Sequence, residues 1–230
     1  MSAAERPPPT PEPRTEGSPP SREARTTRPR PAPEPRTEGP PRPERPLRLF
    51  VALDLPAAAR EALLAFAAAA ADPEVWRPVT PDALHVTLAF LGPRPPADVA
   101  AIERVLAAES GGPAPRLALG DALLLPPRRA RVLCADLEDP DGTLAALQAR
   151  VSEGLAAAGV YTPEKRPFRA HATVARLRPR ARAPRAVAAQ PAALAFRGEA
   201  VTLYASRLHP SGARYEALCR APLATRLADG

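Results

Sequence analysis

A single arrangement of predicted elements occurs twice in this chain, which leaves few folds open to it. Each copy consists of a strand, a helix, a polar loop and a second strand that begins with His-x-Thr. The elements are expected over 47–53, 56–72, 76–82 and 84–91, and again over 131–137, 141–159, 161–169 and from 171 onward. A duplicated unit of this kind predicts two halves related by a pseudo-twofold axis, which would bring the two His-x-Thr strands face to face.

The remaining apolar pattern predicts one further helix and three further strands. The helix is expected over 97–108, and the strands over 116–125, 199–208 and 213–220. We expect Asp141 to cap the helix of the second copy and Gly159 to end it. Together these elements predict an α+β fold. It would have two pseudo-symmetric lobes, each an antiparallel sheet with helices on its outer face, and a catalytic cleft between them.

Residues 1–46 differ sharply in composition from the rest of the chain. They contain 15 of the 34 prolines and almost no large apolar side chain. Such a segment cannot bury enough surface to offset the entropy of ordering it. We therefore expect a disordered Pro/Arg-rich tail over 1–46, one folded domain over 47–222 and a flexible C-terminus over 223–230.

The charge of the chain favours an anionic partner. Residues 1–46 hold nine basic and seven acidic side chains, so most of the net charge of +7 belongs to the folded part, as suits a nucleotide or RNA. No apolar run is long enough to span a bilayer, and the N-terminus lacks a signal-peptide pattern. Cys134 and Cys219 are far apart and form no metal-binding motif. These features predict a cytoplasmic protein with reduced thiols and no membrane partner.

The two His-x-Thr frames supply groups suited to acid–base chemistry on a phosphate. In an extended strand, residues two apart point to the same face, so His85 lies beside Thr87 and His171 beside Thr173. Strict alternation also assigns Phe90 to the buried face. One imidazole can accept a proton, the other can donate one, and the hydroxyls can hold phosphate oxygens. The spacing alone does not decide which histidine has which role.

These frames and their surroundings resemble the 2H phosphoesterase superfamily, and within it the bacterial RNA 2′,3′-cyclic phosphodiesterases, also described as 2′-5′ RNA ligase-like. The resemblance is carried by Leu49–Leu53, Trp76, His85–Gly92, Arg166–Arg176 and Leu203–Tyr215. Two positions depart from the family pattern. Val174 stands where leucine is usual, and Ala170 replaces the proline that usually precedes the second histidine.

The resemblance implies hydrolysis of an RNA-terminal 2′,3′-cyclic phosphate to a 2′-phosphomonoester. It implies that His85 is the proton donor and His171 the proton acceptor, while Thr87 and Thr173 bind the phosphate. No cofactor or metal is expected. The expected partners are RNA 3′ ends that carry the cyclic phosphate, with tRNA fragments among the candidates, and the enzyme is expected to be a monomer.

Three further residues are candidate substrate contacts. Phe50 shares a strand face with charged residues and could stack on a base. Arg176 lies five residues after His171, so a phosphate contact requires a bulge or a strand end. Arg131 belongs to the first of two basic runs that could hold RNA phosphates; the first is Arg128, Arg129 and Arg131, and the second is Lys165, Arg166 and Arg169. His209 lies in a turn context and outside the His-x-Thr frame.

Several other functions use the same residues. Reversible 2′-5′ joining of RNA ends would run the two-histidine chemistry backwards, and a small cyclic nucleotide or an ADP-ribose cyclic phosphate could replace RNA as the substrate. A protein that only binds RNA ends could keep the fold without catalysis. A metallohydrolase with His85, His171 and His209 is disfavoured by the spacing and by threonine neighbours instead of carboxylates.

Overall fold

The computed structural model describes residues 45–209 and 212–224. These residues all belong to one unit of the fold. Most of the expected tail over 1–46 and of the expected C-terminus over 223–230 lies outside the described residues, so these boundaries stay predictions. No helix in the described part of the chain is long and apolar enough to cross a membrane.

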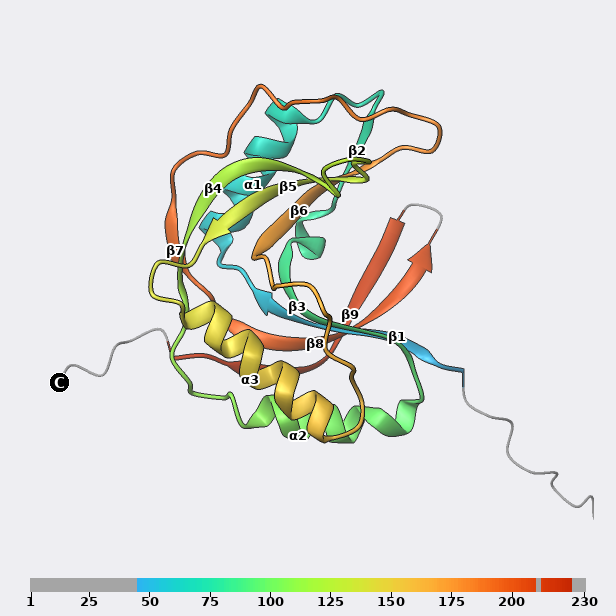
Figure 1. The fold of residues 1–230 in the computed structure, drawn as a ribbon, viewed down its shortest axis with the longest axis vertical. Helices are drawn as coiled ribbons and strands as arrows, with labels where there is room; N and C mark the ends of the chain where they lie inside the picture. The colour runs from blue at the N-terminus through green and yellow to red at the C-terminus, as the bar shows by residue number, and fades with distance from the viewer. Residues whose placement is uncertain (1–44, 210–211, 225–230) are drawn as a thin grey trace, which may run out of the picture. The chain divides into compact units, whose positions relative to one another are not determined.

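An antiparallel sheet of nine strands forms the centre of the fold. The strands are β1 (Leu47–Asp54), β2 (Trp76–Pro78), β3 (His85–Arg94), β4 (Arg116–Leu125), β5 (Val132–Glu138), β6 (His171–Leu177), β7 (Ala195–Arg197), β8 (Ala200–His209) and β9 (Gly212–Pro222). Their order is β7-β4-β5-β6-β3-β1-β8-β9, with β2 paired to β6 outside this path. The sheet is strongly curved, so its two ends approach each other (Figure 1).

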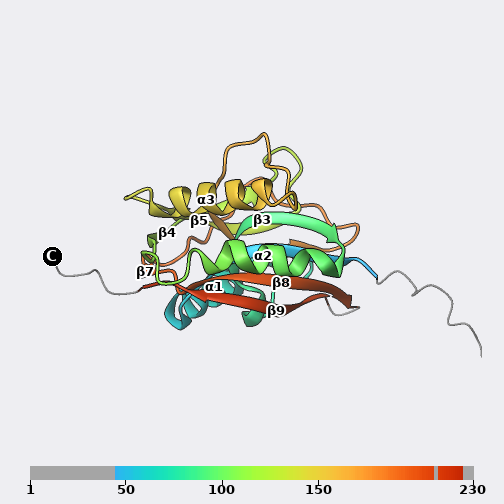
Figure 2. The ribbon, with the colours of Figure 1, turned by 90° about the horizontal axis from the view of Figure 1, so that it is seen from below.

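Three α-helices cover the outer side of this curved sheet (Figure 2). They are α1 (Ala57–Ala70), α2 (Val99–Ala107) and α3 (Thr143–Ala157). Single turns of 3₁₀ helix lie at Pro81–Ala83 and Pro96–Asp98. Apolar residues at helical spacing explain the packing of α2, whose Ile102 and Leu106 are fully buried.

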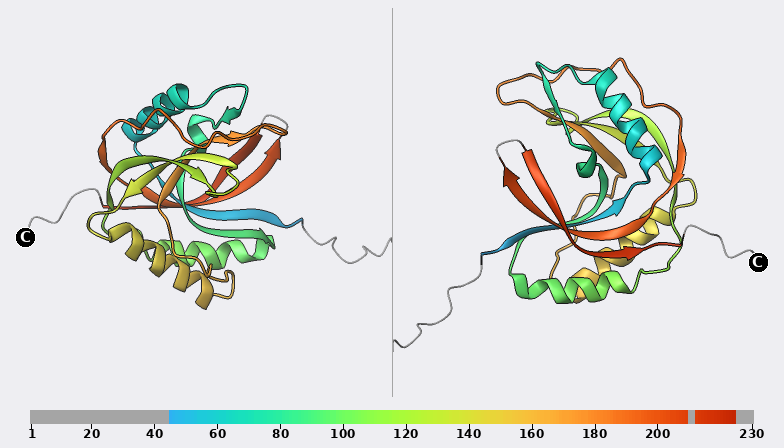
Figure 3. Two further views of the ribbon diagram at one scale, coloured as in Figure 1. Left: turned by 45° about the horizontal axis from the view of Figure 1, so that its top comes forward. Right: turned by 180° about the vertical axis from the view of Figure 1, so that it is seen from behind.

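The helix of each strand–helix–strand copy packs against the His-x-Thr strand of the other copy. Helix α1 lies against β6, whereas α3 lies against β3 and beside α2. Figure 3 shows α1 and the α2–α3 pair at opposite ends of the sheet. The α+β class with antiparallel strands and outer helices is therefore confirmed. The two halves share one continuous sheet and one hydrophobic core, and the further expectation of two lobes is not confirmed.

Asp139 caps α3, and the prediction that Asp141 does so is wrong. The carboxylate of Asp139 accepts hydrogen bonds from the backbone N–H groups of Leu144 (3.2 Å) and Ala145 (2.9 Å). Gly142 precedes the helix with a φ of 66°, a left-handed turn that returns the chain over Asp139. Gly159, with a φ of 71°, ends the helix as predicted.

The Asp139 cap predicts a measurable difference between two neighbouring aspartates. Asp139→Ala should lower the free energy of unfolding by about 1 kcal/mol, because it removes the acceptor for two helix N–H groups. Asp141→Ala is the matched control, since its carboxylate makes only an exposed 3.9 Å ion pair with Arg116. Urea unfolding followed by circular dichroism would measure both. Equal losses for the two variants would contradict the assignment of the cap.

Candidate active site

One pair of residues joins the two His-x-Thr strands. Val86 of β3 lies opposite Ala172 of β6 in an antiparallel pair, and both side chains are buried in the core. Facing residues of antiparallel strands point to the same side of the sheet, and their neighbours point to the other side. The residues that flank this pair therefore turn away from the core.

This register places each histidine across from the other copy's threonine. His85 lies across from Thr173, and Thr87 lies across from His171, because each is one step from the Val86 pair. All four side chains are half-buried on one face of the sheet. Two imidazoles and two hydroxyls thus surround a single site.

A β-bulge in β3 turns Phe90 onto this same face. Consecutive residues of β1 pair with Thr87 and Ala89, so Leu88 between them has no partner in the ladder. Leu88 and Ala89 are both buried, whereas Phe90 is 47% exposed. The prediction from strict alternation, which buried Phe90, is wrong because the extra residue reverses the alternation after it.

A second bulge occupies the equivalent position in β6. Consecutive residues of β5 pair with Thr173 and Ala175, which leaves Val174 as the extra residue. Val174 and Ala175 are both fully buried, and Arg176 returns to the face of the histidines as an exposed side chain. The bulge that a phosphate contact by Arg176 required is therefore present.

Each bulge has its free carbonyl satisfied by a group from a neighbouring element. The side-chain amide of Gln148, on α3, donates to the Leu88 carbonyl at 3.2 Å. The backbone N–H of Val79, after β2, donates to the Val174 carbonyl at 2.9 Å. A buried carbonyl without a partner would be costly, so these bonds stabilise both bulges.

His171 is held by the backbone that precedes it. Its Nδ1 lies 2.8 Å from the carbonyl oxygen of Arg169. A carbonyl only accepts, so Nδ1 carries the proton and donates it, and Nε2 of the neutral ring has a free lone pair. The guanidinium of Arg169 is itself held by Asp136, with nitrogen–oxygen distances of 3.2 and 3.3 Å.

Aromatic side chains surround His85. Its ring centroid lies 4.9 Å from that of Phe50 and 5.4 Å from that of Tyr215, whose plane is nearly perpendicular to it. Tyr204 stacks on Phe50 at 5.3 Å. Phe50 is consequently 4% exposed, which leaves it little surface for stacking on a base. In this structure its ring packs against the imidazole.

Burial holds His85 in its neutral form. Desolvation lowers its pKa to about 4, and the nearby positive charge of Arg176 acts in the same direction. The Ala83 carbonyl and the Asp54 carboxylate oppose this shift. Among the described residues, no group forms a hydrogen bond with the buried Nδ1 of His85. A proton-donor role for His85 therefore requires a bound anion that raises this pKa.

Asp54 anchors the aromatic cluster beside His85, its cross-strand neighbour. The carboxylate accepts hydrogen bonds from the hydroxyls of Tyr204 and Thr202, each at 2.8 Å, and from Nε of Arg220 at 3.1 Å. Burial and the adjacent carboxylate raise the pKa of Tyr204 well above its usual range. Nothing in the sequence pattern singled out Asp54, because its partners come from strands about 150 residues later.

Cys134 supports Thr173 from the adjacent strand. Its Sγ lies 3.5 Å from Thr173 Oγ1. Burial raises the pKa of the Cys134 thiol to about 11, so it is protonated at neutral pH and unsuited to act as a nucleophile. The reactive groups of the site are therefore imidazoles and hydroxyls.

A cavity of about 700 Å³ opens beside Thr87 and His171. Phe90, Phe168 and Arg131 also line it, so one of the three candidate contacts, Arg131, is at this cavity. Its volume lies within the range of small-molecule sites. Its lining is mostly apolar and also includes the charged side chains of Arg131, Glu164, Arg166 and Arg169.

Arg176 does not line this cavity. It borders a small pocket together with Tyr215 and Arg77. The side chain of His209 lies outside the described residues. Among the residues that the structure describes, no group of three or more His, Cys, Asp or Glu side chains is arranged to hold a metal ion.

Comparisons with known proteins identify relatives of this chain. The 2′-5′ RNA ligase superfamily matches residues 50–209. The RNA 2′,3′-cyclic phosphodiesterase of Escherichia coli K12 is 37% identical over 131 residues, which cover 57% of this chain and 72% of that protein.

Solved structures of known proteins match about three quarters of this chain. The structure of Escherichia coli LigT complexed with 3′-AMP is 32% identical, with a TM-score of 0.67, and the match covers 77% of this chain and 98% of that one. A protein of Thermus thermophilus, TT0787, is 28% identical, with a TM-score of 0.65, over 76% and 97% of the two chains.

The buried surroundings of His85 predict that its imidazole titrates at an unusually low pH. In the free protein its pKa should be about 4, because burial disfavours the charged ring. NMR of histidine-labelled protein would measure this directly, with His85→Gln used to assign the signal among only three histidines. A midpoint near the ordinary value of about 6.5 would contradict the burial that the structure shows.

Proposed function

This chain belongs to the 2′-5′ RNA ligase superfamily, and from that premise we propose that it hydrolyses the 2′,3′-cyclic phosphate at RNA 3′ ends. The product would be a 2′-phosphomonoester and a free 3′-hydroxyl. One observation carries the proposal: the Val86–Ala172 pair sets two His-x-Thr frames against each other around one site. The relative that is named an RNA 2′,3′-cyclic phosphodiesterase supports the same reaction.

In this mechanism His171 is the proton acceptor. Its Nδ1–H is bound to the Arg169 carbonyl, so Nε2 presents a lone pair to a water molecule. His171 removes a proton as the water oxygen bonds to phosphorus, in line with the 3′ oxygen. The bond between phosphorus and the 3′ oxygen then breaks.

His85 supplies a proton to the departing 3′ oxygen. It must first be charged, although its pKa in the free protein is about 4. An anionic phosphate beside the ring favours the charged form and raises this pKa. The proton that His171 gains is released to solvent, and His85 takes one up, so one water is consumed in each turnover.

The threonines would hold the two non-bridging oxygens of the phosphate. Thr87 and Thr173 lie across the strands from the opposite histidines, so their hydroxyls flank the space between the rings. Donors fixed in this way contribute about 2–4 kcal/mol each to transition-state stabilisation. Arg176, on the same face, adds positive charge where negative charge develops.

The terminal nucleotide would occupy the 700 Å³ cavity beside His171. Phe90 offers an exposed ring for stacking on the base, and Phe168 lines the same space. Arg131 also lines the cavity, where it can contact a phosphate. Phe90 thus takes the role that the sequence favoured for Phe50.

The superfamily description favours one alternative, 2′-5′ joining of RNA ends. It would use the same groups in reverse, with a 5′-hydroxyl in place of water. Incubating cyclic-phosphate RNA with and without a 5′-hydroxyl partner separates the two reactions. Joined product in excess of the 2′-phosphomonoester would favour the ligase.

Replacing either site histidine should abolish most of the activity. His85→Ala and His171→Ala should each lower kcat by roughly 10²–10⁴-fold in EDTA, the usual contribution of a general acid or base. His209→Ala serves as the matched control and should retain wild-type activity. Chromatography of the products would measure the rate and locate the phosphate. Activity of His171→Ala equal to wild type, or inhibition of wild type by EDTA, would contradict the mechanism.

The pKa of His85 also predicts how the pH profile should change on substrate binding. The profile of kcat/KM, which reports the free enzyme, should have a limb near pH 4. In the profile of kcat this limb should move to higher pH, because the bound phosphate raises the pKa of His85. Initial rates across pH 3.5–9 would test this, and coincident limbs would contradict it.

A further inference from the structure

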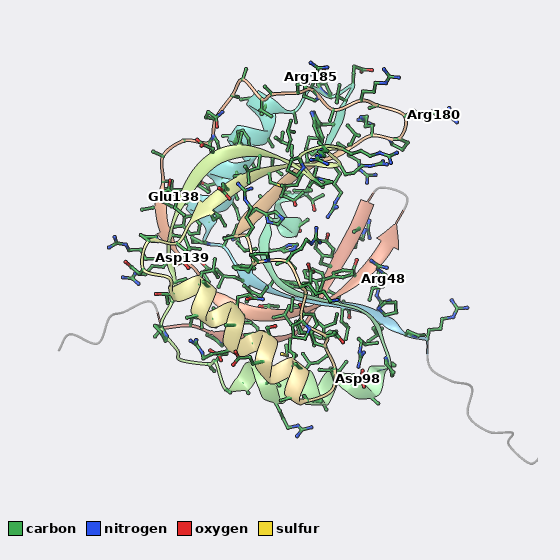
Figure 4. All side chains as sticks on the ribbon, viewed as in Figure 1. Arg48, Asp98, Glu138, Asp139, Arg180 and Arg185 are labelled. Carbon is green, nitrogen blue, oxygen red and sulfur yellow. The ribbon has the colours of Figure 1, made fainter. Side chains whose placement is uncertain are left out.

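A groove lined by arginines adjoins the cavity beside His171. Its volume is about 680 Å³, and no acidic side chain is among the described residues that line it. The residues that define this arginine groove are Arg128, Arg129, Arg131, Arg180, Arg182 and Arg185. Figure 4 shows Arg180 and Arg185 on the long loop that follows β6.

Two segments far apart in the sequence form the arginine groove. One is the turn between β4 and β5, and the other is the loop after β6. A backbone hydrogen bond connects them, because the N–H of Leu177, the last residue of β6, donates to the Arg131 carbonyl at 2.8 Å. Within the first segment, the Arg131 N–H donates to the Leu125 carbonyl at 2.7 Å and closes the turn. Arg180 has a φ of 68°, a left-handed conformation that turns the loop. The fold therefore brings these side chains together.

The charges of the arginine groove lack partners. All six side chains are exposed, and none forms a salt bridge with another residue in the part of the chain that the structure describes. Elsewhere arginines do pair, as Arg150 does with Glu109 and Arg220 with Asp54. Six like charges in one groove repel one another, and a polyanion would relieve this repulsion.

The arginine groove and the cavity adjoin each other, because Arg131 and Pro127 line both. We propose that the arginine groove binds the sugar–phosphate backbone of RNA on the 5′ side of the terminal nucleotide. A chain whose last nucleotide lies beside His171 would pass Arg131 and continue along the other five arginines. This placement rests on the proposed function, which assigns the terminal nucleotide to the cavity.

The chemistry of the groove favours a phosphate backbone over a single nucleotide. Guanidinium groups bind phosphate oxygens in pairs of hydrogen bonds, and six of them exceed what one terminal phosphate can use. They contact phosphates without reading bases, so the groove would favour longer RNA regardless of its sequence. The enzyme would then act on oligonucleotides more efficiently than on cyclic mononucleotides.

The test compares two variants of equal charge. The groove variant combines Arg128→Gln, Arg182→Gln and Arg185→Gln, which leaves Arg131 at the cavity unchanged. The control variant combines Arg104→Gln, Arg116→Gln and Arg150→Gln, three exposed arginines that line neither cavity nor groove. Values of kcat/KM are measured over a range of salt concentrations for a cyclic-phosphate RNA decamer and for a cyclic mononucleotide.

The groove variant should lose at least about tenfold in kcat/KM for the decamer at 0.1 M salt. Its log–log salt slope should fall by about 2, since each single-strand phosphate contact contributes roughly 0.7. The mononucleotide, which does not reach the groove, should react within twofold of the wild-type rate. A decamer rate equal to that of the control variant, or an equal loss for both substrates, would overturn the proposal.

A binding measurement separates this inference from the proposed function. Fluorescence anisotropy with a labelled RNA decamer requires no catalysis. If wild type hydrolyses neither substrate, the proposed function fails. Weaker binding by the groove variant than by the control variant would still support the arginine groove. Equal binding by both variants would overturn it, whatever the outcome of the activity assay.

Discussion

The pairing of Val86 with Ala172 is the contact on which the candidate site depends. It joins the two halves of the sheet and sets the register between β3 and β6. A shift of one residue would turn a histidine and its threonine into the core and bring apolar side chains out. The buried neighbours of this pair, including Leu88 and Val174, oppose such a shift because they fill the core.

The two bulges bring one more side chain from each strand onto the face of the histidines than regular alternation would. Each bulge adds one residue directly after its His-x-Thr frame. As a result, the fifth residue after each histidine points to the same face of the sheet as the histidine. The two copies use this position differently: the first presents Phe90 and the second Arg176. Equivalent bulges in the two strands thus add an aromatic ring and a positive charge to the face of the histidines.

The sequence predicted the strands and helices well because their apolar spacing is regular, and the helix end at Gly159 has a clear local signal. It also identified the His-x-Thr pairs. The sequence could not locate the bulges, because a bulge is recognised only from the pairing of its strand with the neighbouring strand. Asp139 was missed because its cap depends on the turn at Gly142, and the burial of Phe50 depends on Tyr204 and Tyr215 from the last two strands.

The helices pack across the two halves of the sheet, so the assembly of the site depends on the folding of both halves. Helix α1 packs against β6 and helix α3 packs against β3, so each helix buries apolar surface of the other half of the sheet. The two imidazoles come together only after strands some 85 residues apart have paired, a contact of high sequence separation. A folding intermediate with one completed half would therefore carry no assembled site, and the enzyme would gain its activity in a single late step.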